Sequence, residues 1–127
     1  MKQDIQSRED LDQIISTFYQ RLIEDEELFP FFKEIVENNE LEHHLSIIVD
    51  FWEDLLFQTY KYTNNPMQKH LDFQQKRKFE KHHFHLWLQY LHQTIDDGWK
   101  GDKALMMKTR VSSIATVMQV KMNLFES

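Results

Sequence analysis

Apolar side chains recur at spacings of three and four residues along most of the chain, which is the pattern of one face of an α-helix. The first run covers residues 11–23 and follows Ser7 and Asp10, a pair that resembles a capping box. This helix is expected to stop ahead of Pro30, because proline disfavours helical geometry in the residue before it. A short helical piece is then expected to reach Glu37.

A second long helix is predicted after the Asn-Asn pair that precedes Glu40. Asn39 is the expected N-cap, with Glu42 at the reciprocal capping position, and the apolar pattern continues to about Tyr60. Residues 61–66 contain an Asn-Asn-Pro sequence, which is typical of a turn. Proline suits the first position of a helix, so a short helix carrying Met67 and His70 is expected next.

The last part of the chain predicts two further long helices. Residues 72–78 are polar and indicate a loop, and a helix is then expected over residues 79–96, ended by Gly98 and Gly101. Asp102 is expected to cap the final helix. No segment has the pattern of a strand. The sequence therefore predicts an all-α protein with four long helices and two short ones, in a single domain over residues 1–127. The buried side of the final helix is expected to include Leu105, Val111, Ile114, Ala115, Met118 and Met122.

Composition removes several classes of function. The 127 residues include no cysteine, which excludes thiolate metal sites, iron–sulfur ligation and cysteine nucleophiles. Two glycines are too few for a glycine-rich phosphate loop, and a net charge of −6 argues against nucleic acid as a main partner. We find no apolar stretch of the length that a signal peptide or membrane span requires. The protein is therefore expected to be cytoplasmic, with no membrane partner.

Three side chains with polar tips lie within the apolar faces of three different predicted helices: Tyr19, His44 and Trp87. Each could bond to a neighbouring carbonyl group or to a trapped water, as buried polar tips normally do. Together they are typical of a ligand pocket, in which a few polar groups converge inside an apolar shell.

His70 lies on a different kind of segment, after a proline and beside Lys69. A surface or capping role is one interpretation. The other follows from chain geometry, because the helix climbs about 24 Å from His44 to Tyr60 and the next ten residues can span up to roughly 33 Å. The chain can therefore place one histidine above and one below a flat cofactor. A haem held by one imidazole would also account for ten Phe, four Tyr and three Trp residues.

The other histidines give one alternative. His82, His85 and His92 lie opposite Trp87 on their helix and are expected to be solvated, whereas His83 is expected near the core boundary. Two Glu-x-x-His sequences also match an element of ferritin-like di-iron bundles. However, both stand at helix starts, and His43 points away from the apolar face of its helix. This di-iron alternative would use Glu40, His43, Glu80 and His83.

The chain resembles the group III truncated haemoglobins of the globin superfamily. The resemblance is carried by FYQRLIEDEELFPFF at 18–32, HLSIIVDFWEDLLF at 44–57, YTNNPMQKHLDF at 62–73, HHFHLWLQYL at 82–91 and SIATVMQVKM at 113–122. It implies a globin fold in its short two-over-two helical form. The paired glycines typical of the other truncated groups are missing, whereas residues 74–78 are longer and more polar than in some members.

The resemblance also implies a site. It implies haem b with iron bound by His70, and a distal pocket formed by Tyr19, His44 and Trp87. Lys69 is expected to meet a haem propionate, with solvation as the equal alternative. Further positions that match haem-lining residues are Phe18, Phe32, Ile48 and Phe84.

The implied function is binding of O2, and of NO and CO, by a monomeric protein. Two hydrogen-bond donors facing the ligand predict tight binding and slow release, which suits ligand chemistry, sensing or detoxification better than bulk oxygen transport. NO dioxygenase or peroxidase-like activity stays open. Either is expected to need an external reductase, since the 127 residues contain no segment expected to form a reductase domain.

Overall fold

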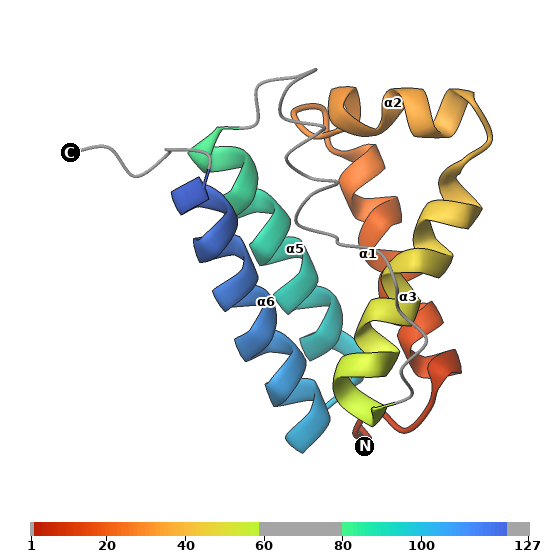
Figure 1. Ribbon diagram of the computed structural model, residues 1–127, viewed down its shortest axis with the longest axis vertical. Coiled ribbons are helices and arrows are strands. Elements are labelled where there is room, and N and C mark those ends of the chain that lie inside the picture. The colour runs from red at the N-terminus through yellow and green to blue at the C-terminus, as the bar shows by residue number, and fades with distance from the viewer. Residues whose placement is uncertain (1, 59–79, 122–127) are drawn as a thin grey trace.

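The computed structural model describes residues 2–58 and 80–121, with the backbone alone at Lys121. An all-α fold is confirmed: within these ranges the chain forms helices and no strand, apart from one isolated bridge between Gln3 and Trp99 (Figure 1). None of the described helices is both long enough and apolar enough to cross a membrane. The helices are α1 (Arg8–Glu24), α2 (Phe29–Glu37), α3 (Leu41–Phe57), α5 (Lys81–Gly98) and α6 (Asp102–Lys121).

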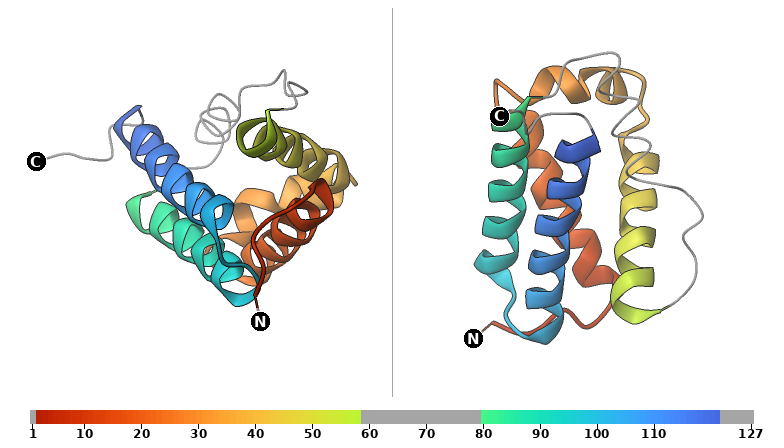
Figure 2. Two further views of the ribbon diagram at one scale, coloured as in Figure 1. Left: turned by 90° about the horizontal axis from the view of Figure 1, so that it is seen from below. Right: turned by 60° about the vertical axis from the view of Figure 1, so that its left-hand side comes forward.

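The four long helices form two pairs. Helices α5 and α6 run side by side as one pair, and α1 lies with α3 in the other, so that the pairs meet as two arms of a V (Figure 2). Helix α1 contacts both α3 and α5 and therefore joins the two arms. The short α2 crosses one end of the molecule and connects α1 to α3 (Figure 1).

The boundaries of the first two helices follow from local chemistry. Ser7 stands at the N-cap of α1, but its side chain makes no capping bond; instead Asp10 accepts a hydrogen bond from the Gln6 N–H at 2.8 Å. After α1, the Asp25 carboxylate accepts hydrogen bonds from the next turn, which fixes the chain reversal before Pro30. The predicted short helix to Glu37 is confirmed.

Two predicted features of α3 are wrong. Asn39 is not its N-cap, because Asn39 has a φ of 57° and Glu40 holds the cap position without a side-chain bond. The helix also ends at Phe57 rather than near Tyr60, since Gln58 adopts the left-handed conformation with a φ of 58°. Its N–H still bonds to the carbonyl of Asp54 and closes the last turn. The predicted short helix with Met67 and His70, and both predicted loops at 61–66 and 72–78, lie outside the described residues.

The predicted buried side of α6 is confirmed for Val111, Ala115 and Met118, is wrong for Leu105, and at Met122 lies outside the described residues. Leu105 is 62% exposed, whereas its neighbours Ala104 and Met107 are buried. Successive residues on a helix are about 100° apart, so a face centred on Ala104 leaves Leu105 outside. The remaining buried positions on this face are Val111, Ala115 and Met118.

Two arginine side chains of α1 connect this helix to α3 and to α5. Arg8 Nη1 lies 2.6 Å from Asp50 Oδ1 and 2.8 Å from Glu53 Oε1 on α3. The hydrogen bond to Asp50, together with that to Glu53, raises the pKa of the Arg8 guanidinium against the opposing effect of burial. On the other side of α1, Arg21 bonds to Thr94 and Asp97 of α5. These contacts fix the orientation of α1, which carries Tyr19.

The start of α6 is capped from the far end of the sequence. Asp4 accepts hydrogen bonds from the backbone N–H groups of Lys103 and Ala104, both at 2.9 Å, so Asp102 is not the capping residue. Gly101 is required here, since a Cβ at this position would stand 2.4 Å from Asp4 Cγ and the residue has a φ of 151°. Burial raises the pKa of Asp4, but these hydrogen bonds and one from Ile5 lower it more, so the net pKa lies below its usual value.

Replacement of Asp4 by alanine is expected to lower the free energy of unfolding by about 1–2 kcal/mol, because two N–H groups of α6 lose their acceptor. Asp4→Asn should cost less, since the amide oxygen still accepts a bond. A carboxyl whose pKa is depressed by folding stabilises the fold above its unfolded pKa, about 3.9, and loses this effect as pH falls through the folded pKa. Denaturant unfolding should therefore show the Asp4→Ala deficit at pH 7 and a smaller one below about pH 4. Asp12→Ala, at an exposed site on α1, is the control. An equal effect of both substitutions would contradict the capping role.

Candidate functional site

Helices α1, α3 and α5 each carry one of the three side chains with polar tips. Tyr19 and Trp87 are buried, with exposed fractions of 2% and 7%, and His44 is half-buried. The Tyr19 hydroxyl lies 2.9 Å from His44 Nε2, and the two rings meet edge to face with centroids 5.3 Å apart. Residues that are 25 positions apart in the sequence therefore form one hydrogen-bonded pair between two helices.

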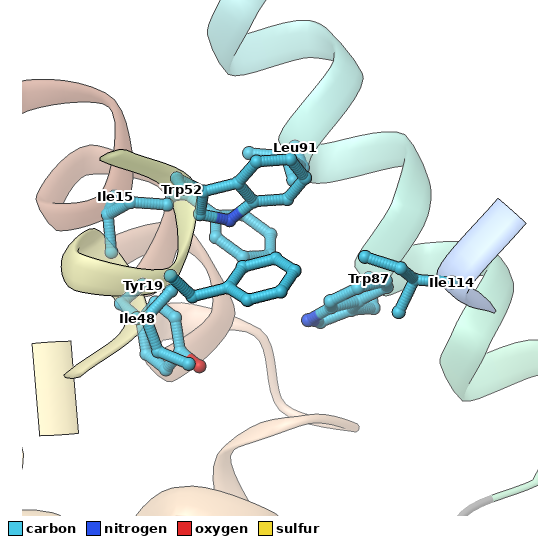
Figure 3. A pocket seen from close by; sticks show the side chains of 9 residues that line it. Ile15, Tyr19, Ile48, Trp52, Trp87, Leu91 and Ile114 are labelled. Carbon is cyan, nitrogen blue, oxygen red and sulfur yellow. The ribbon is translucent and has the colours of Figure 1, made fainter. Parts of the chain in front are cut away.

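Tyr19 and Trp87 also line an apolar pocket between the arms of the fold. The pocket encloses about 410 Å³ of empty space, part of it open to solvent. Figure 3 shows the Trp87 indole nitrogen turned toward the side of the pocket where Tyr19 and Ile48 lie. Apart from the polar tips of Tyr19, Trp52 and Trp87, the side chains that line the pocket are hydrocarbon. The remaining lining residues are Ile15, Phe18, Ile48, Phe51, Trp52, Leu91 and Ile114.

Neighbouring rings hold these side chains in place. Phe18 packs edge to face against both Tyr19 and Trp87, with centroid distances of 5.3 and 5.9 Å. Phe32 of α2 packs against the other side of Tyr19 at 5.5 Å. Edge-to-face contacts restrict ring rotation and are favourable beyond the area that they bury. The positions of the two polar tips are therefore determined by the aromatic core around them.

The Tyr19 hydroxyl keeps its proton at every physiological pH. Complete burial raises its pKa far above the usual value, because the apolar surroundings disfavour a phenolate. The hydroxyl thus has one proton to donate and two lone pairs that accept. If His44 carries its proton on Nε2, the imidazole donates to Tyr19 and the phenol proton is directed elsewhere. With the other tautomer, Tyr19 donates to His44.

The remaining predicted site residues fall into three groups. Phe18 and Ile48 line the pocket, and Phe32 contacts Tyr19 from outside it. Phe84 is buried one turn before Trp87 on α5 but is not among the lining residues. Lys69 and His70 lie outside the described residues.

Sequence reasoning missed five residues of the pocket wall. All belong to apolar helix faces, and Ile15, Trp52 and Leu91 are at positions where the period of 3.6 residues predicts burial. That period separates buried from exposed positions but does not separate a pocket wall from solid core. The five are Ile15, Phe51, Trp52, Leu91 and Ile114.

The four ligands of the di-iron alternative are not assembled. Glu40, His43 and Glu80 are exposed at helix starts. His83 is buried, and its Nδ1 accepts a hydrogen bond from the Glu80 N–H at 2.9 Å, completing a capping box at the start of α5. Burial and the neighbouring His82 lower the pKa of His83, so that its ring is neutral at pH 7.

Two of the three histidines that were expected to be solvated are exposed, and the third is not. His82 and His85 are exposed, in agreement with the prediction. The prediction is wrong for His92, which is half-buried and lies 3.2 Å from both the Lys108 carbonyl and the Ser112 hydroxyl of α6. Because α5 pairs with α6, the part of this face that carries His92 is covered, whereas the part that carries His82 and His85 is open to solvent.

Two comparisons with known proteins, one of sequences and one of structures, both find a truncated haemoglobin. No family model matches the chain. The group 3 truncated haemoglobin ctb of Campylobacter jejuni is 24% identical over 121 residues, which cover 94% of this chain and 93% of the relative. The crystal structure of a group III truncated haemoglobin from Campylobacter jejuni superposes with a TM-score of 0.84 at 23% identity, covering 99% of this chain and 97% of the other. The resemblance read from the sequence is thereby confirmed, and the fold is that of a truncated haemoglobin.

Proposed function

We propose that this protein is a haem-binding globin that binds O2 and related diatomic gases in the pocket beside Tyr19 and Trp87. The observation that carries the proposal is that a phenol and an indole from two helices line one apolar pocket, with an imidazole from a third helix hydrogen-bonded to the phenol. A catalytic or binding site commonly has this composition, with few polar groups in an apolar shell. Similarity to truncated haemoglobins supports the same proposal.

The residues present fit haem b. The pocket walls are aliphatic and aromatic, as a porphyrin face requires, and the polar tips can approach a ligand from one side. When bound, haem would supply a ferrous iron that coordinates a diatomic gas. His70 would hold the iron and Lys69 would neutralise a propionate. Phe18, Ile48, Phe32 and Phe84 would provide apolar contacts.

The distal side chains would then act on the ligand by hydrogen bonding. A diatomic ligand with partial negative charge is stabilised by donors that are already oriented, because no reorganisation is needed when the charge develops. Tyr19 and Trp87 are such donors, each held by edge-to-face contact with Phe18. His44 acts through Tyr19: by donating to the phenol oxygen, it directs the phenol proton into the pocket.

Tight binding and slow release follow from two donors. A protein with these properties suits ligand chemistry, sensing or detoxification better than oxygen delivery. The same polar pocket is compatible with NO dioxygenase or peroxidase-like turnover, for which an external reductase would have to supply electrons.

Tyr19→Phe is expected to raise the O2 dissociation rate about ten- to a hundredfold, because one hydrogen bond to a partly charged acceptor contributes about 1.5–3 kcal/mol. Stopped-flow displacement of O2 by CO measures this rate. Tyr90→Phe is the matched control, since it removes a phenol that bonds to Asp25 at 2.6 Å, away from the pocket lining. A dissociation rate within about twofold of the parent protein would rule out donation by Tyr19.

His44→Leu is expected to raise the O2 dissociation rate by less than Tyr19→Phe does, because His44 orients the phenol and Trp87 still donates. The double variant should release O2 no faster, within about twofold, than Tyr19→Phe alone, since two residues that act as a unit are not additive. The same displacement assay applies. Slower release by His44→Leu would instead mean that His44 competes with the ligand for the phenol proton.

His70→Ala is expected to abolish retention of haem through purification, with added imidazole restoring the Soret band, because a free imidazole replaces the missing iron ligand. His43→Ala, which removes an exposed histidine of α3, should leave the spectrum unchanged. The measurement is the absorption spectrum together with the iron-to-porphyrin ratio. An unaltered spectrum of His70→Ala without imidazole would exclude this histidine as the ligand, and iron without porphyrin would exclude haem.

A further inference from the structure

A cluster of three side chains that can bind a metal lies where α5 begins, beside the turn that precedes α2. Glu27 comes from that turn, and His82 and His83 come from the first turn of α5. One potential ligand atom from each residue lies within 4.8 Å of the other two. None of the three is among the residues that line the pocket.

We propose that Glu27, His82 and His83 form a binding site for a divalent transition metal of the Zn²⁺ class. His82 Nε2 lies 3.4 Å from Glu27 Oε2. Two ligand atoms that each bind a tetrahedral zinc at about 2.1 Å are about 3.4 Å apart, so this pair already has the spacing of metal ligands. The imidazole rings of His82 and His83 are inclined by 40° with centroids 4.0 Å apart, which brings the second imidazole near the pair.

The chemistry of the donors selects the class of metal. Two imidazole nitrogens and one carboxylate oxygen suit zinc, nickel or cobalt, whereas magnesium and calcium prefer oxygen alone. The side chains of His82 and Glu27 are 55% and 59% exposed, so a metal can enter from solvent and keep water in its remaining positions. Glu80 Oε2, 4.0 Å from His82 Nδ1, adds a second negative charge next to the site.

His83 couples the site to the start of α5. Its Nδ1 accepts the Glu80 N–H, so the proton of the neutral ring is on Nε2. A metal bound at Nδ1 would take the lone pair that accepts the Glu80 N–H, and a metal bound at Nε2 would require the ring proton to move to Nδ1, so the capping hydrogen bond is lost in either case. Metal binding therefore competes with the capping box. The Phe31 ring packs edge to face against the His83 imidazole, with centroids 4.7 Å apart, and restricts its rotation.

The haem-loaded protein should be titrated with ZnCl2 at neutral pH by calorimetry, with the haem spectrum recorded in parallel. We expect one equivalent of Zn²⁺ to bind at this site without a change in the Soret band. His82→Ala and His83→Gln should each weaken this binding by at least about tenfold. The glutamine oxygen still accepts the Glu80 N–H, so His83→Gln keeps the helix cap and removes only the ligand.

His43→Ala, which removes an exposed histidine from α3, is the matched control and should bind Zn²⁺ like the parent protein. Thermal unfolding without zinc should be the same for His83→Gln and the parent, which shows that any loss of binding is not a loss of folding. Unaltered zinc binding in both His82→Ala and His83→Gln, or no binding by the parent protein, would overturn the proposal. Neither result depends on whether haem binds O2.

Discussion

Burial of the apolar face of α1 is the constraint on which the rest of the structure depends. Leu11, Ile14, Ile15 and Leu22 are fully buried, and one neighbouring helix cannot cover a face of this width. Helix α3 covers one side of it and α5 covers the other, so the two arms of the fold meet at α1. Tyr19 lies on the same face, and its phenol is therefore brought toward His44 and Trp87 by the packing that buries the leucines and isoleucines.

The cost of burying polar groups explains how the site is arranged. A phenol in apolar surroundings requires a partner, and His44 provides one at 2.9 Å. The two arginines of α1 also have partners. Arg8 forms ion pairs with two carboxylates of α3, and Arg21 forms an ion pair with Asp97 of α5. These contacts leave the centre of the fold apolar, with a few oriented polar tips beside the pocket.

Histidines on one helix illustrate how position determines chemistry. His83 is buried, neutral and engaged in a helix cap, His82 lies in solvent beside Glu27, and His92 contacts α6. The three residues have the same side chain and similar sequence neighbours. Their different surroundings arise from the turn before α2 and from the pairing of α5 with α6, neither of which is encoded within α5.

The sequence by itself determined the helices, the all-α class and the three side chains that meet at the site. These follow from the period of 3.6 residues, which is a local property and survives any arrangement of the helices. Tertiary structure alone decided that Leu105 of α6 is exposed and that Asp4 rather than Asp102 caps α6. It also decided which apolar residues form a pocket wall. Each of these depends on contacts between residues far apart in the chain, and such contacts leave no periodic signal in the sequence.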